Sequence, residues 1–425
     1  MKDSKKVLIL TYYWPPSGGS GVQRWMYFAK HLKALGWEPI VITVDEKQAS
    51  YPVLDHQLLE EVKDIAVLKT DTKEPLKIYS KLISGSRKKV IPQGHVNKKG
   101  WMAKFSAFIR GNFFIPDARI GWNTFALSEA KKLIQKQGIQ KVITTGPPHS
   151  SHLVGLQLKA QFDIQWWADF RDPWTDIFYN KDLYRTVLAQ KKDVSWESKV
   201  LQNADGIFTT VGGNFVQKLT IKAPNQKFHI LPNGYDQDLI LAVPKTSIKP
   251  FHIVYTGLLT DNQDYIPVIK VLNEMADHPY IRLSLAGNIN DHILENIRQT
   301  APKIEIDFKG YLPHKEAIAL MKSGDLLLNF IFKGADLDMI SGKLLEYLAT
   351  EVPVLSIGDP QSEAGKLLSL ASFAQMIDAE DIEAIKAFIE KAFHQKSKAR
   401  NQMADIKKWS RENIAVALSV VLEKS

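Results

Sequence analysis

The chain has 425 residues, 45% of them hydrophobic, and its 55 Lys and Arg residues outnumber its 46 Asp and Glu residues by nine. Single hydrophobic cores rarely grow beyond roughly 250 to 300 residues, so this length predicts two domains. The absence of cysteine excludes disulfide bonds and thiolate metal sites, and it favours a reducing, cytoplasmic compartment.

The amino-terminal sequence predicts neither a secretion signal nor a membrane anchor. Its apolar run, residues 7–10, is short and gives way at once to the sequence from Thr11 to Pro16, so it cannot form the core of a signal peptide. No other stretch approaches the roughly 20 apolar residues of a membrane-spanning helix.

The first predicted elements form a βαβ unit, with strands at 6–12 and 38–44 around a helix at 21–35. The loop before the helix contains Gly18 and Gly19, which allow the backbone to approach a ligand closely. This loop is therefore a candidate for binding a phosphate group or an acceptor.

Arg24 disfavours a dinucleotide-binding dehydrogenase. That fold needs a small residue at this point, because helix and strand pack closely there. Asp45, at the end of the second strand, would suit such a fold, so a dehydrogenase stays among the alternatives.

The segment 76–116 is basic and aromatic, with nine basic residues and no acidic one. This composition suits an anionic membrane surface, and a solvated basic face is the plain alternative. No nucleic-acid-binding motif accompanies it, so we expect no nucleic-acid partner. The bases are Lys77, Lys81, Arg87, Lys88, Lys89, Lys98, Lys99, Lys104 and Arg110, and the large apolar residues are Trp101, Met102, Phe105, Phe108, Ile109, Phe113 and Phe114.

Two polar loops follow the next predicted strands, where ligands of open α/β sheets bind. His149 and His152 follow the strand 141–145, but the loop offers no third metal ligand. Asp169-Phe170-Arg171-Asp172-Pro173-Trp174 follows the strand 164–168. Arg171 either pairs with a neighbouring Asp below a proline turn or belongs to an active-site cluster.

The remaining elements predict a second doubly wound sheet after a polar linker at 242–250. The sequence before the linker contributes a helix at 183–202 and strands at 206–210 and 228–231. The carboxyl-terminal ranges 381–393 and 396–422 are both predicted to be helical. Earlier helices are predicted at 123–137, 291–299 and 314–322, and further strands at 64–70, 251–256, 281–286, 304–308 and 325–330.

The stretch 338–358 combines two acids, a helix start and a buried strand. Ser341 is the expected N-cap of a helix from Gly342, whose free N–H groups, with Lys343, would attract a diphosphate. Glu346 lies on the same helix face as Lys343 and could accept the hydroxyls of a ribose. Asp338 could hold a second ring. The alternative is a capped helix with a surface ion pair.

This acid, seven residues, acid spacing, followed by Pro-Val-Leu, resembles the signature of retaining glycosyltransferases with the GT-B fold. Asp338 stands where that family usually has Glu. The glycine-rich loop and the Asp-x-Arg-Asp-Pro-Trp sequence also resemble the family, the latter a branch acting on surface polysaccharides. Arg171 stands where many relatives have a histidine, and Leu258 and Leu259 replace residues that are often basic in the family.

The resemblance implies an α/β protein with two facing Rossmann-like domains. Residues 1–245 would bind the acceptor and 250–400 the nucleotide-sugar donor, while the helical segment 401–425 would return to the first domain. The implied activity is a retaining, metal-independent transfer of a hexosyl group, from a nucleotide-diphosphate-sugar to a glycan or lipid-linked acceptor. Such an enzyme would serve cell-surface polysaccharide synthesis, peripheral on the inner face of the plasma membrane, with no cofactor.

The resemblance also assigns roles to residues. The catalytic candidates are Asp169, Arg171, His149 and Asp338; the donor-binding candidates are Gly18, Gly19, Ser341, Gly342, Lys343 and Glu346; and the acceptor-side candidates are Asp172 and Arg24.

Four alternatives remain open. The pairs Asp236/Asp238 and Asp336/Asp338 could suggest a metal-dependent glycosyltransferase of the single-domain type, which two sheets disfavour. A GT-B epimerase would convert the nucleotide-sugar without an acceptor, and a non-catalytic protein would only bind it. A dehydrogenase would ignore nucleotide-sugars altogether.

Overall fold

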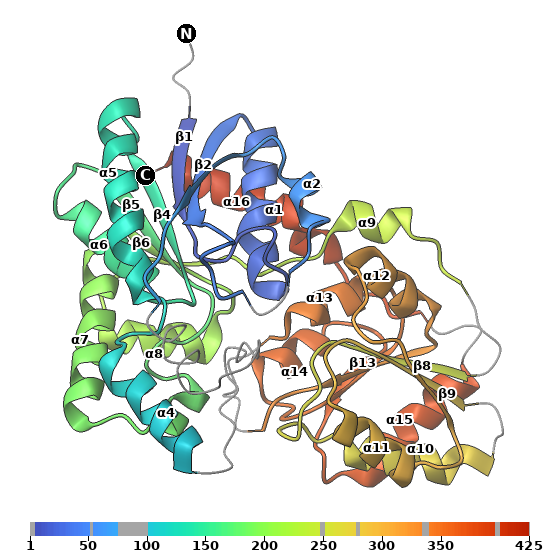
Figure 1. The fold of residues 1–425 in the computed structure, drawn as a ribbon. Helices are drawn as coiled ribbons and strands as arrows, with labels where there is room; N and C mark the ends of the chain where they lie inside the picture. The colour runs from blue at the N-terminus through green and yellow to red at the C-terminus, as the bar shows by residue number, and fades with distance from the viewer. Residues whose placement is uncertain are drawn as a thin grey trace. The chain divides into compact units, whose positions relative to one another are not determined.

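The computed structural model describes residues 5–51, 54–74, 101–246, 251–277, 281–333, 340–395 and 400–424. They form two compact units, one comprising Met1–Asn233 with Ile414–Ser425 and the other Gly234–Asn413 (Figure 1). No helix in these ranges is long and apolar enough to cross a membrane.

The first unit is built on a seven-stranded parallel sheet with the order β3-β2-β1-β4-β5-β6-β7. Its central strands are almost completely buried, because helices cover both faces of a parallel sheet. The order reverses between β1 and β4, where the carboxyl ends of the strands can hold a ligand. The strands are β1 (Lys5–Leu10), β2 (Trp37–Val44), β3 (Ala66–Thr70), β4 (Lys141–Gly146), β5 (Gln165–Phe170), β6 (Gly206–Thr209) and β7 (Phe228–Ile230).

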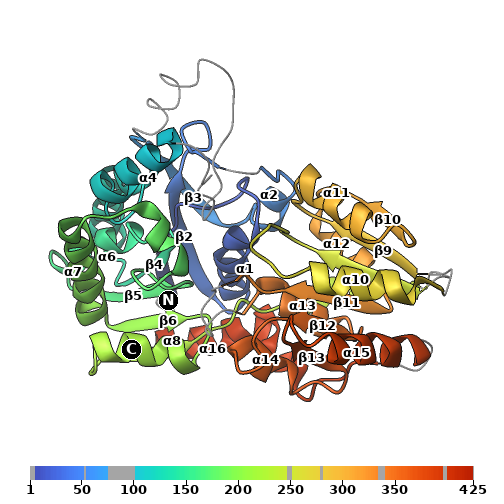
Figure 2. The same ribbon diagram turned by 90° about the horizontal axis from the view of Figure 1, so that it is seen from below.

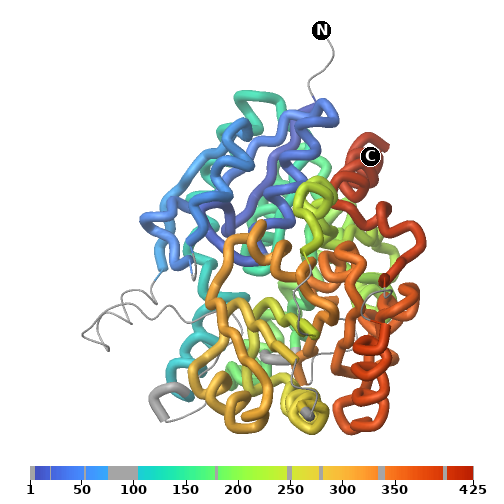
Figure 3. The backbone as a smooth tube through the Cα atoms, turned by 90° about the vertical axis from the view of Figure 1, so that its right-hand side faces the viewer, coloured from blue at the N-terminus to red at the C-terminus, as the bar shows by residue number. Residues whose placement is uncertain are grey.

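The carboxyl-terminal helix, the red end of the tube in Figure 3, completes the core of this first unit. Ile414, Leu418 and Leu422 pack in one cluster with Trp25, and the Trp37 indole donates a hydrogen bond to Ser419 Oγ at 2.9 Å. The helices of this unit are α1 (Ser20–Ala34), α2 (Leu58–Glu61), α4 (Trp101–Phe113), α5 (Asn123–Gln137), α6 (Ser151–Lys159), α7 (Val187–Asn203), α8 (Gly213–Lys222) and most of α16 (Arg411–Glu423).

The second unit has a six-stranded parallel sheet with the order β10-β9-β8-β11-β12-β13 (Figure 2). Side chains alternate between its two faces: Tyr255 and Leu328 join one apolar cluster, and Val254 and Leu327 the other. The strands are β8 (Phe251–Thr256), β9 (Ile281–Ala286), β10 (Glu305–Phe308), β11 (Leu326–Phe330), β12 (Val354–Ile357) and β13 (Ala374–Ile377).

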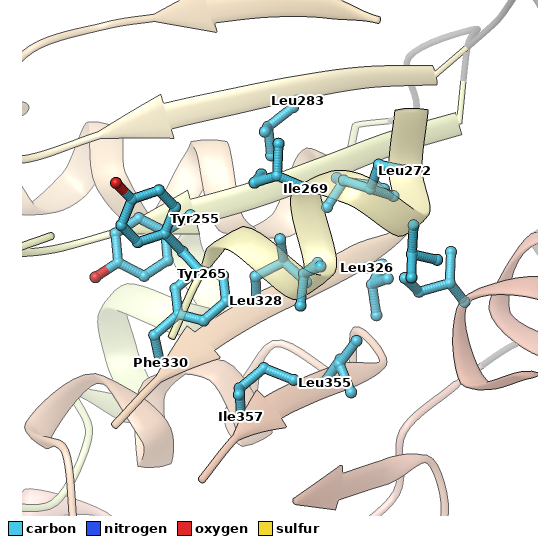
Figure 4. Packing of buried hydrophobic residues seen from close by; sticks show 14 of the residues in the cluster. Tyr255, Tyr265, Ile269, Leu272, Leu283, Leu326, Leu328, Phe330, Leu355 and Ile357 are labelled. Atoms are coloured by element: carbon cyan, nitrogen blue, oxygen red, sulfur yellow. The ribbon is translucent and has the colours of Figure 1, made fainter. Parts of the chain in front are cut away.

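Figure 4 shows α10 against one face of this sheet, with Ile269 and Leu272 packed near Leu283, Leu326 and Leu328. Helices α11 and α15 contribute to the same cluster. The other face is covered by α12, α13 and α14, which share the second cluster. The helices of the second unit are α9 (Gln237–Ala242), α10 (Ile266–Glu274), α11 (Asp291–Thr300), α12 (His314–Ser323), α13 (Gly342–Ala349), α14 (Glu363–Leu368) and α15 (Ile382–His394).

The predicted α/β class with two doubly wound parallel sheets is confirmed. The predicted helix at 396–422 is wrong in its first half, because the described residues before Ile406 are not helical. Asn401 instead places its side chain on the backbone of Phe373 and Val352, and a β-bridge joins Met403 to Ala371. These contacts hold the residues near Asn401 and Met403 in a non-helical conformation.

Candidate functional site

The predicted site residues fall into two groups, one in each unit. Gly18, Gly19, Arg24, His149, Asp169, Arg171 and Asp172 belong to the first unit, and Ser341, Gly342, Lys343 and Glu346 to the second. Asp338 and Asp336, like most of the basic segment (75–100), lie outside the described residues.

Helix α13 begins where the sequence predicts it. Ser341 is the N-cap residue, but its side chain makes no capping hydrogen bond, and its carbonyl accepts one from the Leu344 N–H at 2.9 Å. Leu344, Leu345 and Leu348 are buried in the core of the second unit. This packing fixes the direction in which the first turn presents Lys343.

The Lys343 ammonium group lies at the carboxyl end of β8. Its Nζ donates a hydrogen bond to the Thr256 carbonyl at 2.8 Å and sits 3.9 Å from the centre of the Tyr255 ring. Gly257 has φ +125°, and a Cβ there would lie 3.1 Å from Lys343 Nζ. Burial lowers the pKa of Lys343 to about 7, because a low-dielectric environment disfavours the charged amine.

Glu346 is buried but paired. Its Oε1 accepts hydrogen bonds from His314 Nε2 at 2.8 Å and from Arg411 Nη2 at 3.2 Å. Burial by itself raises the pKa of Glu346, but His314 and Arg411 outweigh it and hold the pKa below its ordinary value. The carboxylate is therefore ionised and can only accept hydrogen bonds. The alternative, an exposed ion pair between Lys343 and Glu346 on the helix surface, does not describe this geometry.

His314 and Arg411 were not among the predicted site residues. His314 opens α12 soon after the carboxyl end of β10, and this position in an open α/β sheet was the available signal. Arg411 opens α16, more than sixty residues beyond Glu346 along the chain. Local pattern gives no sign of such a distant contact.

Arg24 and Asp169 form a fully buried ion pair, with both side chains 0% exposed. Arg24 Nε and Nη2 donate to the carboxylate at 2.7 to 3.2 Å, and Trp25 Nε1 and Thr145 Oγ1 donate at 2.6 and 2.9 Å. Arg24 also donates to the Leu231 carbonyl. The pair thus ties α1 to the carboxyl ends of β4 and β5, and both carboxylate oxygens of Asp169 are engaged within the protein.

Arg171 pairs with Asp172, one of the two acids predicted as its partner. Its Nε lies 3.5 Å from Asp172 Oδ2, and its Nη1 donates to the Gly21 carbonyl at 2.8 Å. Both side chains of this pair are partly exposed, Arg171 by 13% and Asp172 by 35%. Arg171 therefore joins the first turn of α1, through Gly21, to the turn after β5.

His149 and His152 lie in an aromatic environment. The His149 ring stacks on Trp174 with centroids 5.0 Å apart, and the His152 ring stacks on Phe170 at 4.9 Å. Burial lowers the pKa of His149 well below its ordinary value, aided by His152 and Arg171, and lowers the pKa of His152 to about 3. Both imidazoles are therefore neutral at pH 7.

The loop that carries His149 is anchored by Asp117, another residue without a predicted role. Its carboxylate accepts hydrogen bonds from the Ser150 N–H and Oγ, both at 2.8 Å. Within the described ranges, no three His, Asp or Glu side chains gather in a way that could hold a metal ion. His149 and His152 remain a pair of rings without a third ligand.

No protein-family model matches the chain, and no curated protein sequence matches it. Solved structures do. Sucrose-phosphate synthase (tll1590) from Thermosynechococcus elongatus superposes with a TM-score of 0.64 at 15% identity, covering 99% of this chain and 98% of that one. Anabaena Alr3699/HepE in complex with UDP gives 0.61 at 11% identity, with 99% and 100% covered.

A third similar structure is a putative UDP-N-acetylglucosamine 2-epimerase from Listeria monocytogenes, with a TM-score of 0.55 at 12% identity and 99% and 98% coverage. At such identities the likeness establishes the fold alone. The chain therefore shares, over nearly its whole length, the two-sheet GT-B architecture of these nucleotide-sugar-related structures.

Proposed function

We propose that the protein is a retaining glycosyltransferase that moves a hexosyl group from a nucleotide-diphosphate-sugar to a glycan or lipid-linked acceptor. The observation that carries this proposal is the start of α13, where Lys343 and the helix N–H groups accompany an ionised Glu346. A cationic group and an acceptor-only carboxylate suit a diphosphate and a ribose respectively. The fold shared with sucrose-phosphate synthase and HepE supports the same activity.

In this proposal the second unit binds the donor. Lys343, Ser341 and Gly342 hold the diphosphate, and Glu346 accepts the ribose hydroxyls. Lys343 places its charge beside Gly257, where Leu258 and Leu259 leave the turn without a basic residue of its own. Asp338, outside the described residues, keeps its proposed role on the sugar ring. Gly18 and Gly19, in the first unit, keep their role as donor-binding candidates.

Breaking the anomeric bond leaves negative charge on the departing diphosphate. Fixed cations near that group stabilise the transition state more than the ground state, and Lys343 is the cation in this role. His149 and Arg171, from adjacent strand ends of the first unit, are the proposed catalytic residues of that unit, with Asp172 on the acceptor side. Since Arg24 and Asp169 engage one another, they contribute by fixing the loops that carry these groups.

The acceptor proposal includes contact with an anionic membrane, in the service of surface polysaccharide synthesis. Within the described part of the basic segment, Phe105 and Phe113 are 51% and 74% exposed. Helix α4 contacts α7, whose second residue, Leu188, is 80% exposed. The two acids of α7, Asp193 and Glu197, are buried. Apolar residues thus project among bases, as interfacial helices do.

The membrane proposal is tested by flotation with phosphatidylglycerol vesicles. The Phe105→Ser/Leu188→Ser variant should bind far less than the wild type, whereas vesicles of phosphatidylcholine should bind neither protein. Equal flotation of variant and wild type would remove this surface from the proposal.

The transferase proposal is tested by incubating the chain with UDP-, GDP-, ADP- and dTDP-sugars and following thermal stability, donor consumption and product anomer. We expect one nucleotide-sugar to stabilise the wild type more than it stabilises Glu346→Ala, and an α-linked donor to give an α-linked product. Excess chelator should leave the rate unchanged. Conversion of the donor without an acceptor would instead indicate an epimerase, as the Listeria structure suggests for the second candidate. No response to any nucleotide-sugar would overturn both.

A further inference from the structure

Glu346 is held by two residues from other elements of the second unit. His314 is the first residue of α12, and Arg411 is the first residue of α16. We propose that His314 and Arg411 are positioning residues, which fix the Glu346 carboxylate so that it can receive the ribose diol of a nucleotide-sugar. This inference rests on the proposed function and names two residues that determine how its donor site is built.

The geometry leaves one side of the carboxylate open. Both partners bond to Oε1, and Glu346 makes no further hydrogen bond within the described residues. Oε2 is therefore the oxygen that can accept from a ligand. A carboxylate oxygen has two lone-pair sites. The two protein donors occupy those of Oε1, so both hydroxyls of a diol are left to Oε2.

The charges around Glu346 also determine what it can bind. A carboxyl group that is 7% exposed would gain a proton in apolar surroundings unless opposite charges or donors stabilised the anion. Arg411, itself 4% exposed, supplies a permanent positive charge, and His314 supplies an N–H donor. The resulting anion accepts hydroxyl donors, whereas a protonated carboxyl would offer a donor of its own.

The competing explanation is structural: the same contacts could merely fasten α16 and α12 to α13. Burial of Arg411 beside Glu346 is compatible with that role, because removal of either partner leaves an uncompensated buried charge. The two explanations differ in one respect. A positioning residue affects the ligand only through Glu346, so its removal should not matter once Glu346 is gone.

The test is a calorimetric titration with UDP-glucose, GDP-glucose, ADP-glucose and dTDP-glucose, continued with the tightest of the four. His314→Ala and Arg411→Ala should each weaken binding about tenfold, the usual effect of losing a hydrogen bond to a charged group. His314→Gln and Arg411→Lys keep a donor and should recover part of the affinity. The matched controls are His292→Ala and Arg400→Ala, exposed residues of the same unit, which should leave affinity unchanged.

The decisive arm repeats both alanine variants in a Glu346→Ala background. We expect less than about a twofold further change there, with thermal unfolding confirming that each variant is folded. A loss of equal size in both backgrounds would show a purely structural role and overturn the inference, as would full affinity of the two single alanine variants. If the wild type binds none of the four probes, the proposed function is wrong, and the inference that rests on it is wrong as well.

Discussion

Asp169 in the first unit and Glu346 in the second are both buried carboxylates paired with an arginine, but their hydrogen-bond donors are distributed differently over the two oxygens. Asp169 has donors on both oxygens, from Arg24, Trp25 and Thr145. Glu346 has both of its donors on one oxygen. The first arrangement is closed and serves the fold, whereas the second leaves hydrogen-bonding capacity for a ligand. A buried acid at a strand or helix end is thus not in itself a catalytic group.

Breaking the closed arrangement should have the largest effect on stability. Arg24→Ala leaves the Asp169 charge buried without its cation, which costs about 3 to 5 kcal/mol. Chemical denaturation should show this loss as a lower midpoint. Replacing Asp169 by Leu and Arg24 by Met, residues of similar volume, should restore much of the stability, because no buried charge then remains. An unchanged midpoint for Arg24→Ala would contradict the closed arrangement.

A change at Lys343, which lies on the same helix as Glu346, should affect turnover rather than folding. Lys343→Met preserves the apolar stem beside Tyr255 but removes the ammonium group, so we expect kcat/KM to fall about a hundredfold, the effect of losing one transition-state stabilising group. The unfolding midpoint should stay close to that of the wild type. A variant with full turnover would exclude Lys343 from the leaving-group site.

A milder change sharpens the description of Asp169. Thr145→Val removes a single donor to Asp169 Oδ2 and leaves Arg24 and Trp25 in place. The expected loss is about 2 kcal/mol in the free energy of unfolding, the contribution of one hydrogen bond to a charged group. A loss as large as that of Arg24→Ala would mean that the ion pair is not the main stabilising interaction.

The smallest expected effect is in the pH dependence of donor binding. Burial lowers the pKa of Lys343 to about 7. In the protein without ligand, the Lys343 ammonium group therefore loses its proton as the pH rises through 7. A bound diphosphate favours the charged form and raises that pKa. Binding should therefore take up a proton near pH 7.5 and weaken several-fold between pH 6 and 8. Calorimetry in buffers of different ionisation enthalpy measures this uptake, which Lys343→Met should lack.

Sequence pattern was sufficient for part of the regular elements, whereas helices such as α10 and α8 were not predicted. The strands at 251–256 and 281–286 and the helix at 123–137 coincide with the observed ones, because buried parallel strands and amphipathic helices have strong periodic signals. The error at 396–422 has the opposite cause. Its helical composition is overridden where Asn401 bonds to backbone groups distant in sequence.

The candidate site could be predicted only in part. Helix propensity and the acid spacing located Lys343 and Glu346, but no local rule pairs Glu346 with Arg411. The sequence likewise does not indicate whether Arg171 pairs with Asp169 or with Asp172. Arg24, far back in the chain, occupies Asp169 and leaves Asp172 to Arg171. Such pairings depend on topology, which brings strand ends together irrespective of sequence distance.

Helix α16 makes it difficult to produce either unit as a separate fragment. Its first residue supplies a charge to one lobe, while Ile414, Leu418 and Leu422 line the apolar interior of the other. A fragment ending at Asn233 would lack this helix and expose the apolar surface around Trp25, so it should aggregate. Adding residues 411–425 back as a separate peptide should keep such a fragment in solution.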